Sequence, residues 1–136
     1  MRFIILVKAT KDSEAGVMPS QKLLAEMGAY HEELARTGVL VDGNGLKPSS
    51  KGWRVKYSKG GRSFVDGPFA ETKELVAGYT IINVKSRDEA IAWTRRFPNP
   101  TFGGEGEIEV RQYFELEDFG DSPAIDKARE IQLGTR

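Results

Sequence analysis

The sequence predicts an α+β fold in which two helices cover one face of a single antiparallel sheet. Two stretches have the apolar spacing of amphipathic helices, and several others have the two-residue alternation of strands. A chain of 136 residues can bury one hydrophobic core without disulfides. Its hydrophobic content of 39% and charged content of 29% are those of an ordinary globular protein. We therefore expect one folded domain.

The first strand is predicted from Arg2 to Lys8. Its apolar side chains alternate between two faces, with Phe3, Ile5 and Val7 on one and Ile4 and Leu6 on the other. A strand that is apolar on both faces is typical of the centre of a sheet. The polar segment that follows, "TKDSEAGVMPS", is expected to be a connection.

The first long helix is predicted from about residue 19 to Thr37. Pro19 and Ser20 are typical of a first helical turn, and Gly38 provides a left-handed stop. The buried stripe is expected to consist of Leu23, Leu24, Met27, Leu34 and Ala35.

Several strands are expected in the middle of the chain. A short strand is predicted in "VLVDGNGL", and "GWRVKYS" and "RSFVDG" are predicted to form a hairpin through "KGG". Trp53, Val55 and Tyr57 then share one side of the hairpin. The next strand, "LVAGYTIINVK", is apolar on both faces, so we expect it to lie beside the first strand.

A second helix is predicted to begin at Ser86, with Glu89 completing a capping box, and to end near Pro98. The run "GEIEVRQYFEL" predicts a last strand with one polar face. We expect a domain over residues 1–116 and a C-terminal arm or tail over residues 117–136, with at most a short helix in "SPAIDKAREI".

This order of elements predicts a ferredoxin-like split β-α-β sandwich. Helices cover only one side of such a sheet, yet the two central strands are apolar on both sides. A large bare apolar face is rare on a monomer, and a second copy of the chain is the simplest cover. We therefore predict a homodimer that forms through the open sheet face.

The composition disfavours several classes of function. The net charge is zero, so nucleic acid is an unlikely partner. With no cysteine, one histidine and no recognisable metal motif, we expect neither a bound metal nor a cofactor. No apolar run is long enough to span a bilayer, and the predicted location is the cytoplasm.

One local exception to the charge balance lies in "KGWRVKYSKGGR", which alternates five basic residues with Trp53 and Tyr57. Such a pattern can bind phosphate-bearing ligands or single-stranded nucleic acid. A hairpin with a solvated cationic face has the same pattern and is the more frequent explanation.

The stretch "DGPFAETKE", followed by "GYTIINV" and a helix with "DEAIAW", resembles the YCII-related family in its DGPF-containing branch, from Met1 to about Leu116. The resemblance implies a dimeric ferredoxin-like α/β barrel in the cytoplasm of a bacterium. Most members have no established activity. Some relatives resemble small lyases that use a histidine and an aspartate, and DGPF proteins also occur beside sigma factors.

Only some of the family's characteristic residues have a match in this sequence. The position of the histidine in those lyase-like relatives corresponds to Met27, and His31 lies four residues further along nearly the same helix face. Asp66, Gly67, Pro68 and Phe69 match the DGPF motif directly.

The candidate catalytic residues are His31 and Asp66. Histidine exchanges a proton near neutral pH and needs a carboxylate to orient it, which either Asp66 or Asp42 could supply. The candidate ligand-binding residues are Met27, Asp42, Phe69 and Tyr79. Simpler roles remain open, because His31 can be a hydrogen-bonded structural residue and Asp66 can stabilise a turn.

Two functions follow from these residues. The first is a small-molecule-binding or accessory protein with a pocket between the first helix and the sheet, with a link to sigma-factor regulation implied by the resemblance. The alternative is a cofactor-independent lyase or isomerase that uses His31 as general base with an aspartate partner. The replacement of the family histidine by Met27 favours the first.

Overall fold

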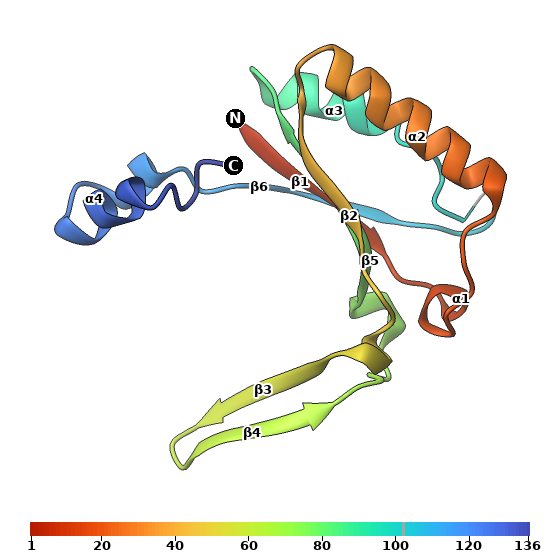
Figure 1. The fold of residues 1–136 in the computed structure, drawn as a ribbon, viewed down its shortest axis with the longest axis horizontal. Coiled ribbons are helices and arrows are strands. Elements are labelled where there is room, and N and C mark those ends of the chain that lie inside the picture. Colours follow the sequence, from red (N-terminus) through yellow and green to blue (C-terminus); the bar gives the residue numbers. More distant parts are fainter. Residues whose placement is uncertain (102) are drawn as a thin grey trace.

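The computed structural model describes residues 1–101 and 103–136 and has a four-stranded antiparallel sheet at its centre (Figure 1). The strand order is β2-β5-β1-β6. The bounds are Arg2–Lys8 for β1, Leu40–Gly45 for β2, Val76–Asn83 for β5 and Ile108–Gln112 for β6. This arrangement is consistent with the ferredoxin-like plan.

The two strands that are apolar on both faces occupy the centre of the sheet, as predicted. β1 pairs with β5 from Arg2↔Asn83 onward, and its other edge pairs with β6. Ile5 and Ile82, on the helix-covered face, have no exposed surface. Central strands of a sheet are typically apolar on both faces, so their sequences do not alternate between apolar and polar residues.

Helix α2, Gln21–Arg36, begins and ends with the predicted signals. The hydroxyl of Ser20 accepts from the backbone N–H of Leu23, which satisfies one of the free donors of the first turn. Gly38 has φ of +77°, the left-handed conformation that glycine adopts without steric cost. The helix starts two residues later than predicted, because Pro19 precedes the cap instead of opening the first turn.

The predicted buried stripe of α2 is partly wrong. Leu23 and Leu34 are buried, but Leu24 is 47% exposed and Ala35 is exposed. Tyr30 takes the place at the core, with 5% of its surface exposed. A tyrosine can be buried there because its hydroxyl donates to the carbonyl of Trp93 at 2.8 Å.

Helix α3, Arg87–Arg95, packs beside α2 on the same face of the sheet (Figure 1). Ser86 caps it by accepting from the N–H of Glu89 at 3.1 Å. The ring of Tyr30 makes edge-to-face contacts with Trp93 and Phe97, at centroid distances of 6.2 and 5.2 Å. These aromatic contacts join the two helices above the sheet.

Three short helical turns lie in the connections. The segment predicted to be a plain connection contains α1, Lys11–Glu14, in which Thr10 and Ser13 cap each other. The other two are 3₁₀ turns, η1 at Ser49–Lys51 and η2 at Thr72–Glu74.

The predicted hairpin is present as a separate two-stranded sheet of β3, Trp53–Ser58, and β4, Gly61–Asp66. It projects away from the body of the molecule (Figure 1). Nearly all of its residues are exposed.

The C-terminal segment continues from β6 as an arm with a 3₁₀ turn η3, Leu116–Phe119, and helix α4, Pro123–Glu130. Arg2 anchors both ends of this arm to the sheet, because it forms an ion pair with Glu115 and donates to the backbone oxygens of Gly134 and Arg136. The arm and the hairpin both extend on the side of the sheet opposite α2 and α3 (Figure 1). The division of the chain at residue 116 stays a prediction.

The sheet face opposite α2 and α3 is called the open face here. It carries Ile4 and Leu6 of β1 and their cross-strand partners Ile81 and Tyr79, all of them half-buried. No helix in the described part of the chain is both long and apolar enough to cross a bilayer.

Candidate functional site

The residues predicted to form a site lie in three separate places. His31 and Met27 are on α2 above the helix-covered face of the sheet. Asp42 and Tyr79 interact with each other on β2 and β5. Asp66 ends β4 at the base of the hairpin, where Phe69 follows it.

Both ring nitrogens of His31 are engaged within the chain. Nδ1 lies 2.8 Å from the carbonyl oxygen of Met27, and Nε2 lies 2.7 Å from Oγ1 of Thr80. A carbonyl can only accept, so Nδ1 carries the proton and, in the neutral ring, Nε2 accepts from the threonine hydroxyl. Thr80 is only 1% exposed. This hydrogen bond connects α2 to β5 in the interior.

A glycine beneath His31 allows this close approach. A side-chain carbon at Gly43 would lie 3.3 Å from Nε2 of His31 and 3.3 Å from the carbonyl oxygen of Tyr79. Contacts that short are tighter than most carbon contacts in proteins, so a larger residue at 43 would push the imidazole away from Thr80.

The structure does not bring His31 together with either predicted carboxylate. In the β2–β5 pairing, Gly43 is opposite Thr80 and Asp42 is opposite Ile81. Successive strand residues point to opposite faces, so Asp42 lies on the open face while His31 lies on the helix-covered face. Asp66 is opposite Trp53 in the exposed hairpin. The catalytic roles of His31 and Asp66 stay predictions.

The open face carries a polar cluster of Asp42, Asn44 and Tyr79. The hydroxyl of Tyr79 donates to Oδ2 of Asp42 at 3.3 Å, and Nδ2 of Asn44 donates to the same hydroxyl at 3.3 Å. Asn44 is not among the site residues predicted from the sequence. The two-residue spacing from Asp42 was the available signal, because positions i and i+2 of a strand share a face.

Tyr113 belongs to the same face, because it follows β6 opposite Arg2. Burial raises the pKa of the Tyr113 hydroxyl above its ordinary value, while Arg2 lowers it. Tyr79 and Asp42 raise it further.

The DGPF motif forms a tightly anchored corner between the hairpin and β5. The N–H of Gly67 donates to the carbonyl of Gly52 at 3.0 Å, and the N–H of Phe69 donates to Oγ of Ser49 at 3.1 Å. The carboxylate of Glu14 in turn accepts from the N–H and the hydroxyl of Ser49. The corner therefore ties together α1, η1 and β4.

Glycine is required at position 67 because the backbone of Ser49 passes directly beside it. A side-chain carbon there would lie 1.8 Å from the carbonyl oxygen of Ser49, which is far too short for two non-bonded atoms. The bond between Gly67 and Pro68 is cis. The guanidinium of Arg54 lies 3.8 Å from the centroid of the Phe69 ring and covers that face of the ring.

An open pocket of about 340 Å³ lies next to this corner. Glu14, Lys51, Leu75 and Val76 are among its lining residues, whereas none of the predicted ligand-binding residues lines it. In residues 1–101 and 103–136, no three histidine, aspartate or glutamate side chains are grouped so that they could hold a metal ion.

Comparison with known proteins places the chain in a family. The family model of the YCII-related domain matches residues 1–117. An uncharacterized protein of Rhizobium meliloti (strain 1021) is 31% identical over 91 residues, which cover 67% of this chain and 73% of that protein. The DGPF-containing branch stays a prediction from the motif.

Among solved structures, a 5-chloro-2-hydroxyhydroquinone dehydrochlorinase from Burkholderia phenoliruptrix AC1100, in complex with 2,5-dihydroxybenzoquinone, matches with a TM-score of 0.48 and 17% identity. The match covers 89% of this chain and 100% of that one. The matched family model spans most of the chain. This chain therefore belongs to the family of proteins with a YCII-related domain.

Proposed function

We propose that this protein is a homodimeric small-molecule-binding protein whose ligand contacts the open face through Asp42, Asn44 and Tyr79. The observation that carries the proposal is the hydrogen-bonded cluster of these three side chains on a sheet face that no helix in residues 1–101 and 103–136 covers. A few polar groups next to apolar side chains are typical of small-molecule sites.

The chemistry of the cluster indicates the kind of ligand. The hydroxyl of Tyr79 donates to one oxygen of Asp42, which leaves the second carboxylate oxygen and the amide oxygen of Asn44 as acceptors. Leu6 and Ile81 flank the cluster with apolar surface. These groups favour a compact apolar molecule that carries a hydroxyl or amine donor.

The second copy is proposed because the open face is apolar at its centre. Ile4, Leu6 and Ile81 are half-buried by their neighbours alone. Covering such a face with an identical face gives a closed two-fold dimer and removes the remaining apolar surface from water. The ligand cluster is near strand β2, at one edge of that interface.

The binding site can be tested with ¹⁵N-labelled protein titrated with a library of small aromatic and aliphatic alcohols and amines. We expect amide shifts at residues 42–44 and 79, and about two- to tenfold weaker binding in Tyr79→Phe, since one hydrogen bond contributes about 0.5–1.5 kcal/mol. Tyr57→Phe is the matched control, because Tyr57 is on the exposed hairpin. Shifts confined to His31 and Thr80, or equal affinity of both variants, would contradict the proposal.

The geometry gives less support to the alternative, a cofactor-independent lyase or isomerase with His31 as base. Its Nε2 is directed at the hydroxyl of a buried threonine, and its Nδ1 at a backbone carbonyl. A general base needs a free nitrogen within reach of the substrate proton. Ligand binding that survives His31→Gln would agree with the binding function. The association with a sigma factor stays a prediction from the family resemblance.

A further inference from the structure

The β3–β4 hairpin presents an apolar face that its own chain leaves bare. Its register places Trp53, Val55 and Tyr57 on the same face as Phe64. Trp53 is 62% exposed, Tyr57 70% and Phe64 71%. An isolated two-stranded ribbon is marginally stable in water, and exposed aromatic clusters mark interaction surfaces. The exposed face of the hairpin is therefore available to a partner surface.

The charge of the hairpin limits what that partner can be. Residues 51–65 contain no acid and five basic residues, namely Lys51, Arg54, Lys56, Lys59 and Arg62. None of these forms an ion pair with the described part of the chain. Arg54 and Arg62 instead lie over the rings of Phe69 and Tyr57. The partner surface should be acidic and should carry apolar side chains.

The C-terminal arm of the same chain has those two properties. Residues 114–126 contain no base and five acids, namely Glu115, Glu117, Asp118, Asp121 and Asp126. Glu115 and Asp126 have ion-pair partners at Arg2 and Arg129, whereas Glu117 and Asp121 have none among the described residues.

The arm also exposes apolar rings. Phe114 is 72% exposed and Phe119 58%, and their ring centroids are 5.1 Å apart. Ile131 and Leu133 are exposed further along the arm. Acidic side chains around an aromatic pair on the arm therefore match an aromatic hairpin face that also carries Arg62 and has Lys59 in its turn.

We propose that the hairpin of one copy docks on the C-terminal arm of a second copy, with its aromatic face against Phe114 and Phe119 and with Lys59 and Arg62 near Glu117 and Asp121. This inference rests on the proposed homodimer and specifies a contact beyond the open face. The acidic side chains and exposed rings of the arm complement the hairpin, which favours a second copy over nucleic acid as the partner.

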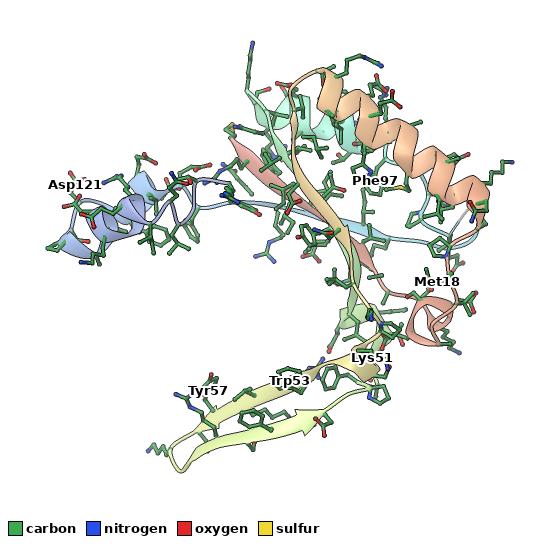
Figure 2. The ribbon with its side chains drawn as sticks, in the orientation of Figure 1. Met18, Lys51, Trp53, Tyr57, Phe97 and Asp121 are labelled. Carbon is green, nitrogen blue, oxygen red and sulfur yellow. The ribbon has the colours of Figure 1, made fainter. Side chains whose placement is uncertain are left out.

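The placement of the two segments agrees with a reciprocal contact. Figure 2 shows Trp53 and Tyr57 on the projecting hairpin and Asp121 on the distant arm, both on the side of the open face. In a two-fold dimer, each hairpin can meet the partner's arm, so the contact is formed twice and leaves no free end for further growth.

Zero-length cross-linking of lysines to carboxylates tests this contact directly. Natural-isotope and ¹⁵N-labelled protein are mixed, allowed to exchange subunits and cross-linked with a carbodiimide. We expect peptides that join Lys51 or Lys59 to Glu117 or Asp121, about half of them of mixed isotope. Links of a single isotope only would place the arm on its own hairpin, and absence of these links would also overturn the proposal.

Charge reversal gives a second test. Lys59→Glu/Arg62→Glu should weaken self-association about fourfold or more at low salt, because two lost ion pairs of about 0.2–1 kcal/mol each count twice in a symmetric dimer. Adding Glu117→Lys/Asp121→Lys to the same chain should restore it. Lys11→Glu/Lys85→Glu is the control with the same charge change on exposed positions outside the hairpin.

Sedimentation separates failure of this contact from failure of the proposed homodimer. A dimer that is indifferent to the hairpin charges would overturn the docking and leave the open-face dimer intact. A protein that stays monomeric at all concentrations would overturn both the open-face dimer and the docking. Intact self-association combined with loss of oligo-dT binding in Lys59→Glu/Arg62→Glu would identify the hairpin as a nucleic-acid surface and overturn the docking.

Discussion

His31 and Thr80 share a hydrogen bond of 2.7 Å between Nε2 and Oγ1 that joins helix α2 to the central strand β5. The lone histidine of the chain is thus part of the packing between helix and sheet. Its other nitrogen is held by the carbonyl of Met27 one turn earlier. The residue most suited to proton transfer is also a structural link, and its contribution to stability can be measured.

Thr80→Val should destabilise the protein by about 1 kcal/mol or more, because Nε2 of His31 loses its hydrogen-bond donor. Valine has nearly the same volume as threonine, so the packing should not change. Urea unfolding of Thr80→Val, His31→Leu and the double variant forms a cycle that isolates the pair. We expect the double variant to lose less stability than the sum of the losses in the two single variants. Strict additivity would show that the hydrogen bond does not contribute.

Gly67→Ala should destabilise the DGPF corner by at least about 2 kcal/mol, because the new carbon would overlap the carbonyl of Ser49. Gly60→Ala is the matched control, since no atom lies within 4 Å of a side-chain carbon at that position of the hairpin. Thermal unfolding and hydrogen exchange of residues 49–52 report the effect. Equal melting temperatures of the two variants would mean that the corner adapts freely.

The ion pair between Arg2 and Glu115 predicts an acid dependence of stability. The hydrogen bond from Arg2 lowers the pKa of Glu115 below its ordinary value of 4.5, with burial acting in the opposite direction. The ion pair contributes fully to stability above the pKa that Glu115 has in the unfolded chain. This contribution is lost as the pH falls through the lower pKa of Glu115 in the folded chain.

The measurement compares unfolding of the unaltered chain with Glu115→Gln from neutral pH to pH 3. We expect a stability difference that is constant at neutral pH and shrinks once the pH falls below about 4.5. Glu117→Gln, which removes a neighbouring carboxylate without an ion-pair partner among the described residues, should show a much smaller difference. A Glu115→Gln difference that grows in acid would contradict the assignment.

The buried hydroxyl of Tyr30 should make the protein less stable at alkaline pH. Burial raises the pKa of Tyr30 from 10.0 to about 12. The unfolded chain loses this proton first, so the stability contributed by Tyr30 is complete below pH 10 and falls between pH 10 and 12, by about 2–3 kcal/mol.

Tyr30→Phe provides the reference, because phenylalanine keeps the ring contacts and has no hydroxyl to ionise. Its stability should depend less on pH above 10, so the two unfolding curves approach each other and then cross. Parallel curves over this interval would show that the Tyr30 hydroxyl has its ordinary pKa.

The sequence alone determined the strands, the two helices that cover the sheet and the hairpin. These are local features: alternation marks β1 and β5 as central, Ser20 and Ser86 cap their helices, and Gly38 ends α2. The tertiary structure decided which face of α2 is buried, because Tyr30 could enter the core only with the carbonyl of Trp93 as its partner.

The candidate site depended on strand register, which spacing along the chain does not encode. Asp42 and Gly43 are neighbours in sequence, yet register with β5 puts Gly43 under His31 and Asp42 on the open face with Tyr79. The same non-local pairing gives His31 a threonine as its partner and leaves the predicted aspartates elsewhere. Composition supplied the chemical groups, and the pairing of distant strands decided which of them meet.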